Sequence, residues 1–125
     1  MPWGNSAKAP AVLIVEDEPL IRTGAVYIIE DAGFEVVEAA SADEAIRILE
    51  RRSDIRVVFT DIHMPGSMDG LKLAHAVRNR WPPIKIMVTS GRELIAQQVL
   101  PEGGRFFAKP YNSIEILAAL REWAL

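Results

Sequence analysis

The sequence contains no cysteine, carries no net positive charge and has no long apolar run. The absence of cysteine excludes disulfide bonds and thiolate metal sites. A net charge of −3 gives no basic surface of the kind that binds nucleic acid. No apolar run reaches the roughly 18 residues that a membrane-spanning helix needs. These absences favour a cytoplasmic protein that binds neither nucleic acid nor membranes.

The chain of 125 residues has room for one hydrophobic core. Half of its residues are apolar and a quarter are charged, which is typical of a globular domain. Residues 1–10 are mostly small or polar and lack the apolar core of a signal peptide. We therefore expect a loose N-terminal leader over residues 1–10 and a single domain over residues 11–125.

Short apolar runs alternate with helical patterns along this domain. The runs predict strands over residues 11–15, 34–38, 55–60, 84–89 and 105–108. A helical pattern follows each strand, and the pattern after the fourth strand is a short one over residues 92–100. The alternation predicts an α/β fold, a single doubly wound (βα)5 domain whose five-stranded parallel sheet has helices on both faces.

Several helix boundaries carry signals in the sequence. Pro19 suits the first turn of the first helix, and Gly33 suits the position just after its end. Ser41 and Glu44 form a capping box, and Ser113 is the expected N-cap of the last helix. We expect the first and last helices to turn these apolar residues inward: Leu20, Ile21, Ala25, Ile28 and Ile29 in the first, and Ile114, Leu117, Leu120 and Ala124 in the last.

Polar residues stand at the carboxyl ends of four predicted strands. They are Glu16 and Asp17 after the first strand, Asp61 after the third, Thr89 at the end of the fourth and Lys109 after the fifth. In a parallel sheet these ends meet at one edge, where ligands bind. Three carboxylates repel one another unless a cation intervenes, and Mg²⁺ prefers oxygen ligands of this kind. A carboxylate beside Mg²⁺ can attack a phosphoryl donor, and an ammonium and a hydroxyl can stabilise the transferred oxygens.

Each of these residues has an ordinary explanation when it is taken alone. Acids after a strand and a lysine near a chain end are most often solvated, and threonine is common in strands. A zinc site built on His63 would need further histidine or cysteine ligands, and the chain has two histidines and no cysteine. The prediction of a site therefore depends on all of the residues falling at the same edge of one sheet.

Four local sequences resemble the receiver domains of two-component response regulators, a CheY-like family with a flavodoxin-like fold. They are VLIVEDE at residues 12–18, VVFTDIHMPGSMDG at residues 57–70, MVTSG at residues 87–91 and FFAKP at residues 106–110. The resemblance covers residues 11–125, and the motifs follow one another in the family's order.

The resemblance implies a phosphoacceptor and a metal site. Asp61 is the implied phosphoacceptor. Asp17 and Asp61 would hold Mg²⁺ directly, Glu16 would hold it through water, and the backbone carbonyl of His63 would complete the protein ligands. Glu16 stands where many members have aspartate, so this arm of the metal site is one methylene longer.

The resemblance also implies how a phosphoryl group is held. Thr89 would donate a hydrogen bond to it, and Lys109 would form an ion pair with it. The peptide bond between Lys109 and Pro110 is a candidate for the cis form. Phe106 occupies the position of an aromatic residue that turns inward when Thr89 moves, and plain core packing explains an aromatic side chain there equally well.

The function that we expect is a phosphorylation switch. A histidine kinase or a phosphotransfer protein would deliver a phosphoryl group to Asp61. The protein, a monomer or weak dimer without an output domain, would then signal to a downstream protein in trans. It would be no enzyme beyond its own phosphorylation and dephosphorylation.

Two alternatives stay open. One is a Mg²⁺-dependent phosphohydrolase with an aspartyl-phosphate intermediate. Phosphohydrolases of the haloacid dehalogenase type need a second acid two residues after the nucleophile, and this chain has His63 there. The other alternative is a receiver module excised from a hybrid histidine kinase.

Overall fold

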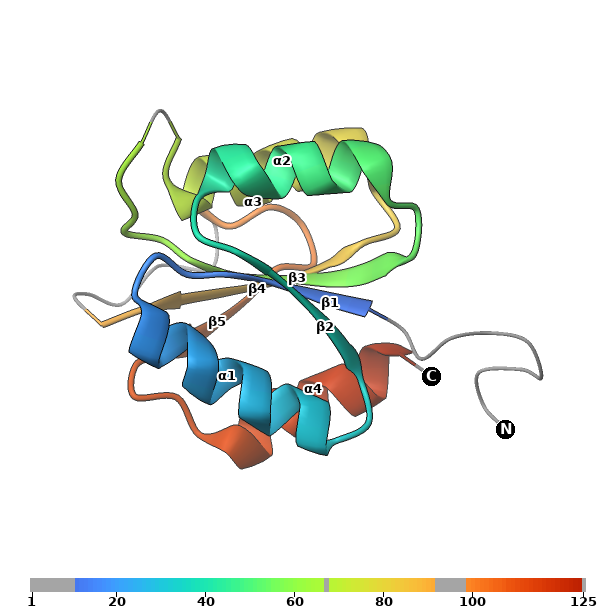
Figure 1. Cartoon of the computed structure of the whole chain (residues 1–125). Helices are drawn as coiled ribbons and strands as arrows, with labels where there is room; N and C mark the ends of the chain where they lie inside the picture. The colour runs from blue at the N-terminus through green and yellow to red at the C-terminus, as the bar shows by residue number, and fades with distance from the viewer. Residues whose placement is uncertain (1–10, 67, 92–98, 125) are drawn as a thin grey trace.

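The computed structural model describes residues 11–66, 68–91 and 99–124, and a parallel five-stranded sheet lies at its centre (Figure 1). The strands are β1 (Ala11–Val15), β2 (Glu35–Ala39), β3 (Ile55–Asp61), β4 (Lys85–Ser90) and β5 (Arg105–Ala108), in the spatial order β2-β1-β3-β4-β5. The described helices are α1 (Pro19–Asp31), α2 (Ala42–Arg51), α3 (Gly70–Arg80) and α4 (Ser113–Ala124). The predicted fold class is confirmed, and each predicted strand is present to within one residue at either end. The helix expected over residues 92–100 falls largely outside the described residues.

Helices cover both faces of the sheet, with α2 and α3 on one face and α1 and α4 on the other (Figure 1). Alternate residues of β1 join the two cores that result. Leu13 and Val15 pack in the core beneath α2 and α3, whereas Val12 and Ile14 pack in the core beneath α1 and α4. Burial on both faces explains why the strands read as continuous apolar runs. Within the described residues, no helix combines the length and the apolarity that crossing a membrane requires.

The inward face of α1 differs from the prediction at one residue. Ala25 and Ile29 are buried as expected, but the Leu20 side chain is 88% exposed. Leu20 lies on the same side of the helix as Gly24 and Tyr27, both of which are exposed. Because one side of a helix holds only every third or fourth residue, Leu20 cannot face the core together with Ala25 and Ile29.

The same geometry corrects the prediction for α4. Ile116 and Leu120 are buried and Leu117 is half-buried, but Ile114 is 74% exposed. Ile114 shares its side of the helix with Ala118, which is also exposed. The side chain of Ala124, the remaining residue of the prediction, lies outside the described ones.

Of the two N-caps predicted from the sequence, one is confirmed and the other is wrong. In α2, the hydroxyl oxygen of Ser41 accepts a hydrogen bond from the backbone N–H of Glu44, as predicted. The N-cap of α4 is Asn112, whose side-chain oxygen accepts from the N–H of Ile114 at 2.7 Å. Ser113, the predicted cap, is instead the first helical residue. Two adjacent residues that can both cap a helix leave the sequence ambiguous by one position.

Candidate functional site

The parallel register brings the predicted polar residues to one edge of the sheet. Glu16 directly follows β1, Asp61 ends β3, and Lys109 directly follows β5. Asp61 lies opposite Thr89 in the pairing of β3 with β4. Backbone hydrogen bonds continue this alignment beyond the strands, since the N–H of Lys109 donates to the carbonyl oxygen of Ser90 at 2.9 Å.

Three carboxylates and one ammonium form the centre of the site. Glu16, Asp17 and Asp61 each place a carboxylate oxygen within 4.8 Å of the other two. The Lys109 ammonium lies 2.9 Å from Glu16 Oε1 and 3.3 Å from Asp61 Oδ2. Glu16 and Asp61 are buried, whereas Asp17 is half-buried and lines an open cleft of about 370 Å³. The cluster keeps a formal excess of two negative charges, which favours the binding of a cation there.

Burial and pairing shift the pKa values of Glu16 and Lys109 in opposite directions. Burial raises the pKa of Glu16, the hydrogen bond from Lys109 lowers it, and the net shift is upward. For Lys109, burial lowers the pKa, but the hydrogen bond to Glu16 and the charge of Asp61 outweigh it and raise the pKa. Lys109 therefore stays charged at neutral pH and offsets part of the negative charge.

Two buried polar atoms at this edge lack a hydrogen-bond partner within the described part of the chain. They are Oγ1 of Thr89 and Nε2 of His63. His63 lines the cleft together with Asp17, Asp61 and Lys109. A buried hydroxyl without a partner is costly, so Thr89 Oγ1 is an available donor in the small cavity that Asp61 also lines.

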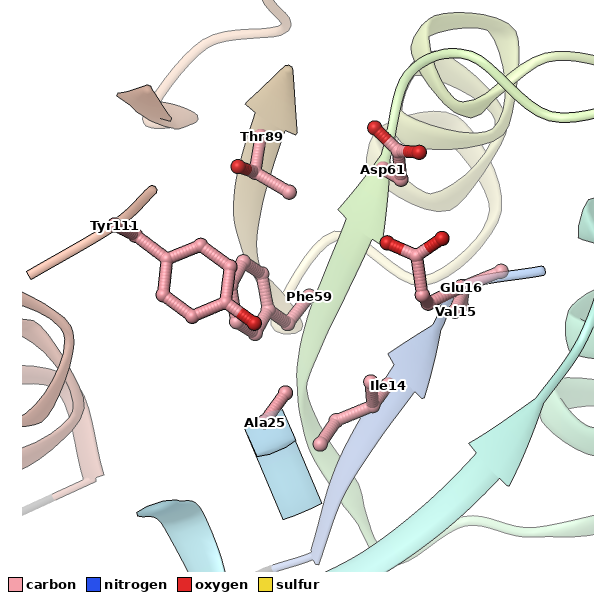
Figure 2. Close-up of a pocket in the computed structure, with 8 residues that line it drawn as sticks. All are labelled: Ile14, Val15, Glu16, Ala25, Phe59, Asp61, Thr89 and Tyr111. Carbon is pink, nitrogen blue, oxygen red and sulfur yellow. The ribbon is translucent and has the colours of Figure 1, made fainter. Parts of the chain in front are cut away.

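A cavity of about 10 Å³ lies between Thr89, Glu16 and Asp61 (Figure 2). Its far wall is formed by Tyr111, whose ring meets Phe59 edge-on with centroids 5.4 Å apart. Burial raises the pKa of the Tyr111 hydroxyl. The sequence did not point to Tyr111, because it lies in the loop between β5 and α4, where no periodic pattern fixes the direction of a side chain.

Two predicted residues lie beside the cluster rather than in it. Phe106 is half-buried in β5 and packs against the core beneath α2 and α3. The peptide bond between Lys109 and Pro110 is cis, in agreement with the expectation.

Sequence reasoning also missed Arg22 in α1, which donates a hydrogen bond to the backbone carbonyl of Glu16 at 2.7 Å.

The backbone of Asp61 is held closely by the start of α3. The N–H of Gly70 donates to the carbonyl oxygen of Ile62 at 2.8 Å. A Cβ atom at Gly70 would lie 1.7 Å from the carbonyl oxygen of Asp61, so only glycine fits this approach. Gly70, the last residue of the second motif, therefore lets the start of α3 pack directly against the backbone of Asp61.

The sequence matches one family model, that of the response regulator receiver domain, over residues 12–121. The chain belongs to this family. Like the other members, this receiver domain is a module of two-component signalling. The confirmed fold and the four motifs at the sheet edge agree with the assignment.

The receiver domain is similar to parts of longer proteins. It is 35% identical over 115 residues to the sensor kinase CckA of Brucella abortus, covering 89% of this chain and 12% of that protein. It is 40% identical over 97 residues to the protein-glutamate methylesterase/protein-glutamine glutaminase 3 of Hahella chejuensis, covering 74% of this chain and 27% of that protein. The chain thus spans roughly an eighth to a quarter of these curated relatives.

The fold also matches solved receiver domains over nearly their whole length. The crystal structure of the receiver domain of NtrX from Brucella abortus has a TM-score of 0.81 at 30% identity, covering 90% of this chain and 97% of that one. The crystal structure of the receiver domain from the hybrid histidine kinase CckA has a TM-score of 0.77 at 29% identity, covering 92% of this chain and 99% of that one.

Proposed function

We propose that Asp61 accepts a phosphoryl group from a phosphohistidine of a histidine kinase or a phosphotransfer protein. The observation that carries the proposal is the convergence of three carboxylates within 4.8 Å with the Lys109 ammonium at 2.9 and 3.3 Å from two of them. The cluster combines a nucleophile, a cation site and a fixed positive charge.

The residues of the cluster fit Mg²⁺. They offer only oxygen ligands, which this hard cation prefers, and the cleft beside them leaves room for the waters that it retains. Asp17, Asp61 and the backbone carbonyl of His63 would hold the ion directly, and Glu16, whose carboxylate is engaged by Lys109, would hold it through water. When bound, Mg²⁺ neutralises charge on the phosphoryl oxygens and so lets a carboxylate approach them.

The transfer itself needs no further reactant. A carboxylate oxygen of Asp61 forms a bond to phosphorus while the phosphorus–nitrogen bond of the donor breaks, and the electron pair stays on the imidazole nitrogen. The product is an acyl phosphate on Asp61. Lys109 already lies within reach of Asp61 and would pair with the new phosphoryl oxygens, and Thr89 Oγ1 would donate a hydrogen bond to one of them.

The new hydrogen bond of Thr89 would be the start of the signal. Phe106 lies in β5, the neighbour of β4, and would turn inward when Thr89 moves. The altered surface would then bind a downstream protein, with the domain acting as a monomer or weak dimer that catalyses only its own phosphorylation and dephosphorylation. Residues 11–125 would be the signalling unit and residues 1–10 a leader.

An apolar groove beside the site supports docking of a donor protein. The groove has a volume of about 360 Å³ and is lined mainly by α1 and by the loop after β5. The exposed Leu20 lies on it, and Lys109 links it to the acidic cluster. An apolar surface next to a reacting carboxylate can bind a helix that carries the phosphohistidine.

The similarity to a sensor kinase favours one variation of this function. The sensor kinase CckA of Brucella abortus is 35% identical to this chain over the matched region, and a solved receiver domain of a hybrid histidine kinase CckA has the same fold. By analogy, the present domain would act as the receiver module of a larger kinase, with the same chemistry at Asp61. An immunoblot of the source cells gives the size of the native protein. That size distinguishes a free receiver domain from a receiver module of a larger kinase.

Intact-protein mass spectrometry after incubation with acetyl phosphate and Mg²⁺ tests the phosphoacceptor. We expect a single phosphoryl adduct in the wild type, none in Asp61→Asn, and none when Mg²⁺ is chelated. Asp69→Asn is a matched control, because the Asp69 side chain caps α3 and asparagine caps a helix equally well. An adduct that persists in Asp61→Asn contradicts the assignment. Continuous hydrolysis of a phosphate monoester, which is not a phosphoryl donor like acetyl phosphate, identifies a phosphohydrolase instead.

A further inference from the structure

We propose that Arg22 is a positioning residue that orients Asp17 and thereby sets the affinity of the acidic cluster for Mg²⁺. This inference rests on the proposed function of the cluster. Arg22 lies near the start of α1, and its guanidinium joins the loop after β1 to β2. Its Nη1 donates to the backbone carbonyl of Glu16 at 2.7 Å, and its Nε donates to Glu38 Oε1 at 3.0 Å.

The carbonyl that Arg22 binds belongs to the peptide unit between Glu16 and Asp17. Because a peptide unit is planar, holding its oxygen also fixes the direction in which the chain enters Asp17. The same loop is also held by other contacts. The N–H of Glu16 donates to the Ala39 carbonyl oxygen at 3.0 Å, and Glu16 Oε2 accepts from the N–H of Glu18 at 3.1 Å. Among these contacts, the one from Arg22 is made to the carbonyl oxygen of Glu16 itself.

The loop needs such a restraint because its charges repel one another. Asp17 stands between two other acids in the sequence and shares a 4.8 Å cluster with Asp61 and Glu16. Without the guanidinium, repulsion would favour loop conformations in which Asp17 turns away into solvent. The Arg22 side chain is only 21% exposed, so its contact with the carbonyl is less screened than an ordinary surface pair.

The two contacts of Arg22 use the shape of its side chain. The guanidinium presents its nitrogens in a fixed plane, so one edge can reach the carbonyl while Nε reaches Glu38. A lysine ammonium at this position would keep the charge but would not have the rigid fork. Glu38, on β2, therefore provides a second anchor for the guanidinium, outside the loop.

Titration calorimetry with MgCl2 on the full chain, in parallel with urea unfolding, tests the inference. We expect Arg22→Gln to raise the dissociation constant for Mg²⁺ about tenfold, the lower end of what residues that support metal ligands contribute. Arg22→Lys should be intermediate. The control is Arg105→Gln, which removes a surface ion pair between β5 and α4 (Arg105 with Glu122) and should leave the constant unchanged.

Phosphorylation by acetyl phosphate supplies a second readout. In Arg22→Gln, the Mg²⁺ concentration for half-maximal rate should rise with the dissociation constant, while the rate at saturating Mg²⁺ stays near that of the wild type. Glu38→Gln weakens only one of the two anchors and should raise the dissociation constant by a factor smaller than that of Arg22→Gln. If Arg22→Gln does not fold, Glu38→Gln alone tests the inference. An unchanged dissociation constant for Mg²⁺ in Glu38→Gln would then overturn it.

The outcomes separate the inference from the proposed function. If the wild type binds Mg²⁺ and Arg22→Gln binds it equally well, the contacts of Arg22 do not set the Mg²⁺ affinity, and the function of Asp61 is unaffected. If the wild type does not bind Mg²⁺, the proposed function fails and the inference fails with it.

Discussion

Gly70 offers the most direct test of how the backbone positions Asp61. A Cβ atom there would lie 1.7 Å from the carbonyl oxygen of Asp61, 2.7 Å from its carbonyl carbon and 2.9 Å from the Cα atom of Ile62. Nonbonded atoms prefer separations of roughly 3.5 Å. All three atoms belong to the backbone, so no side chain can swing aside. In Gly70→Ala, the start of α3 or the end of β3 must therefore shift by about 1.5 Å or more.

Two effects should follow from this shift. We expect the free energy of unfolding to fall by about 1–3 kcal/mol, because an added methyl group in a packed site forces neighbouring atoms off their preferred positions. We expect phosphorylation of Asp61 to slow about a hundredfold, because a displacement of about 1 Å at a reacting group has an effect of that size.

Urea unfolding measures the first effect, and the rate of adduct formation with acetyl phosphate and Mg²⁺ measures the second. Gly24→Ala is the control, since nothing lies within 4 Å of a Cβ atom at this position in α1. Alanine should stabilise that helix by about 0.5–1 kcal/mol and leave the phosphorylation rate unchanged. If Gly70→Ala kept both the stability and the rate of the wild type, the close approach would not control the position of Asp61.

Two further predictions concern the polar groups of the site. Thr89→Val should leave the free energy of unfolding unchanged or raise it, because it removes a buried hydroxyl that has no partner in the described part of the chain. Urea unfolding measures this. A loss above about 1 kcal/mol would show that the hydroxyl is hydrogen-bonded in the unphosphorylated protein. The raised pKa of Lys109 means that its stabilising effect is complete below its ordinary pKa of 10.5 and is lost as the pH rises through the higher value of the folded state. The difference in unfolding free energy between the wild type and Lys109→Met, measured without Mg²⁺, should therefore shrink above pH 10.5. A difference that stays constant across that pH would contradict the assigned pairing.

The sequence alone was sufficient to predict the sheet and the residues at its edge. Apolar runs that end at acids mark the carboxyl ends of strands, and the parallel arrangement then requires these ends to meet. Asp61 and Thr89 illustrate this, because they are 28 positions apart in the chain and opposite each other in the sheet. The argument depends only on strand order and direction, which alternating elements fix strongly.

The contacts that refine the site could not be predicted in the same way. Arg22 reaches the Glu16 carbonyl through the conformation of a long side chain, and Tyr111 closes the cavity from a loop. The exposed Leu20 and Ile114 show a related limit. Each of their helices has more apolar residues than one side can bury, and the pattern does not say which residue is left outside.

The shortest strand of the sheet also has a mechanical consequence. β5 has four residues and, among the strands that the structure describes, pairs with β4 alone, yet its two phenylalanines pack on opposite faces of the sheet. Phe106 packs in the core beneath α2 and α3, and Phe107 packs in the core beneath α1 and α4. Densely packed interiors transmit displacements rather than absorb them. A movement of β5 that begins at Lys109 would therefore displace packed side chains in both cores. One event at the sheet edge would then alter two opposite surfaces of the domain.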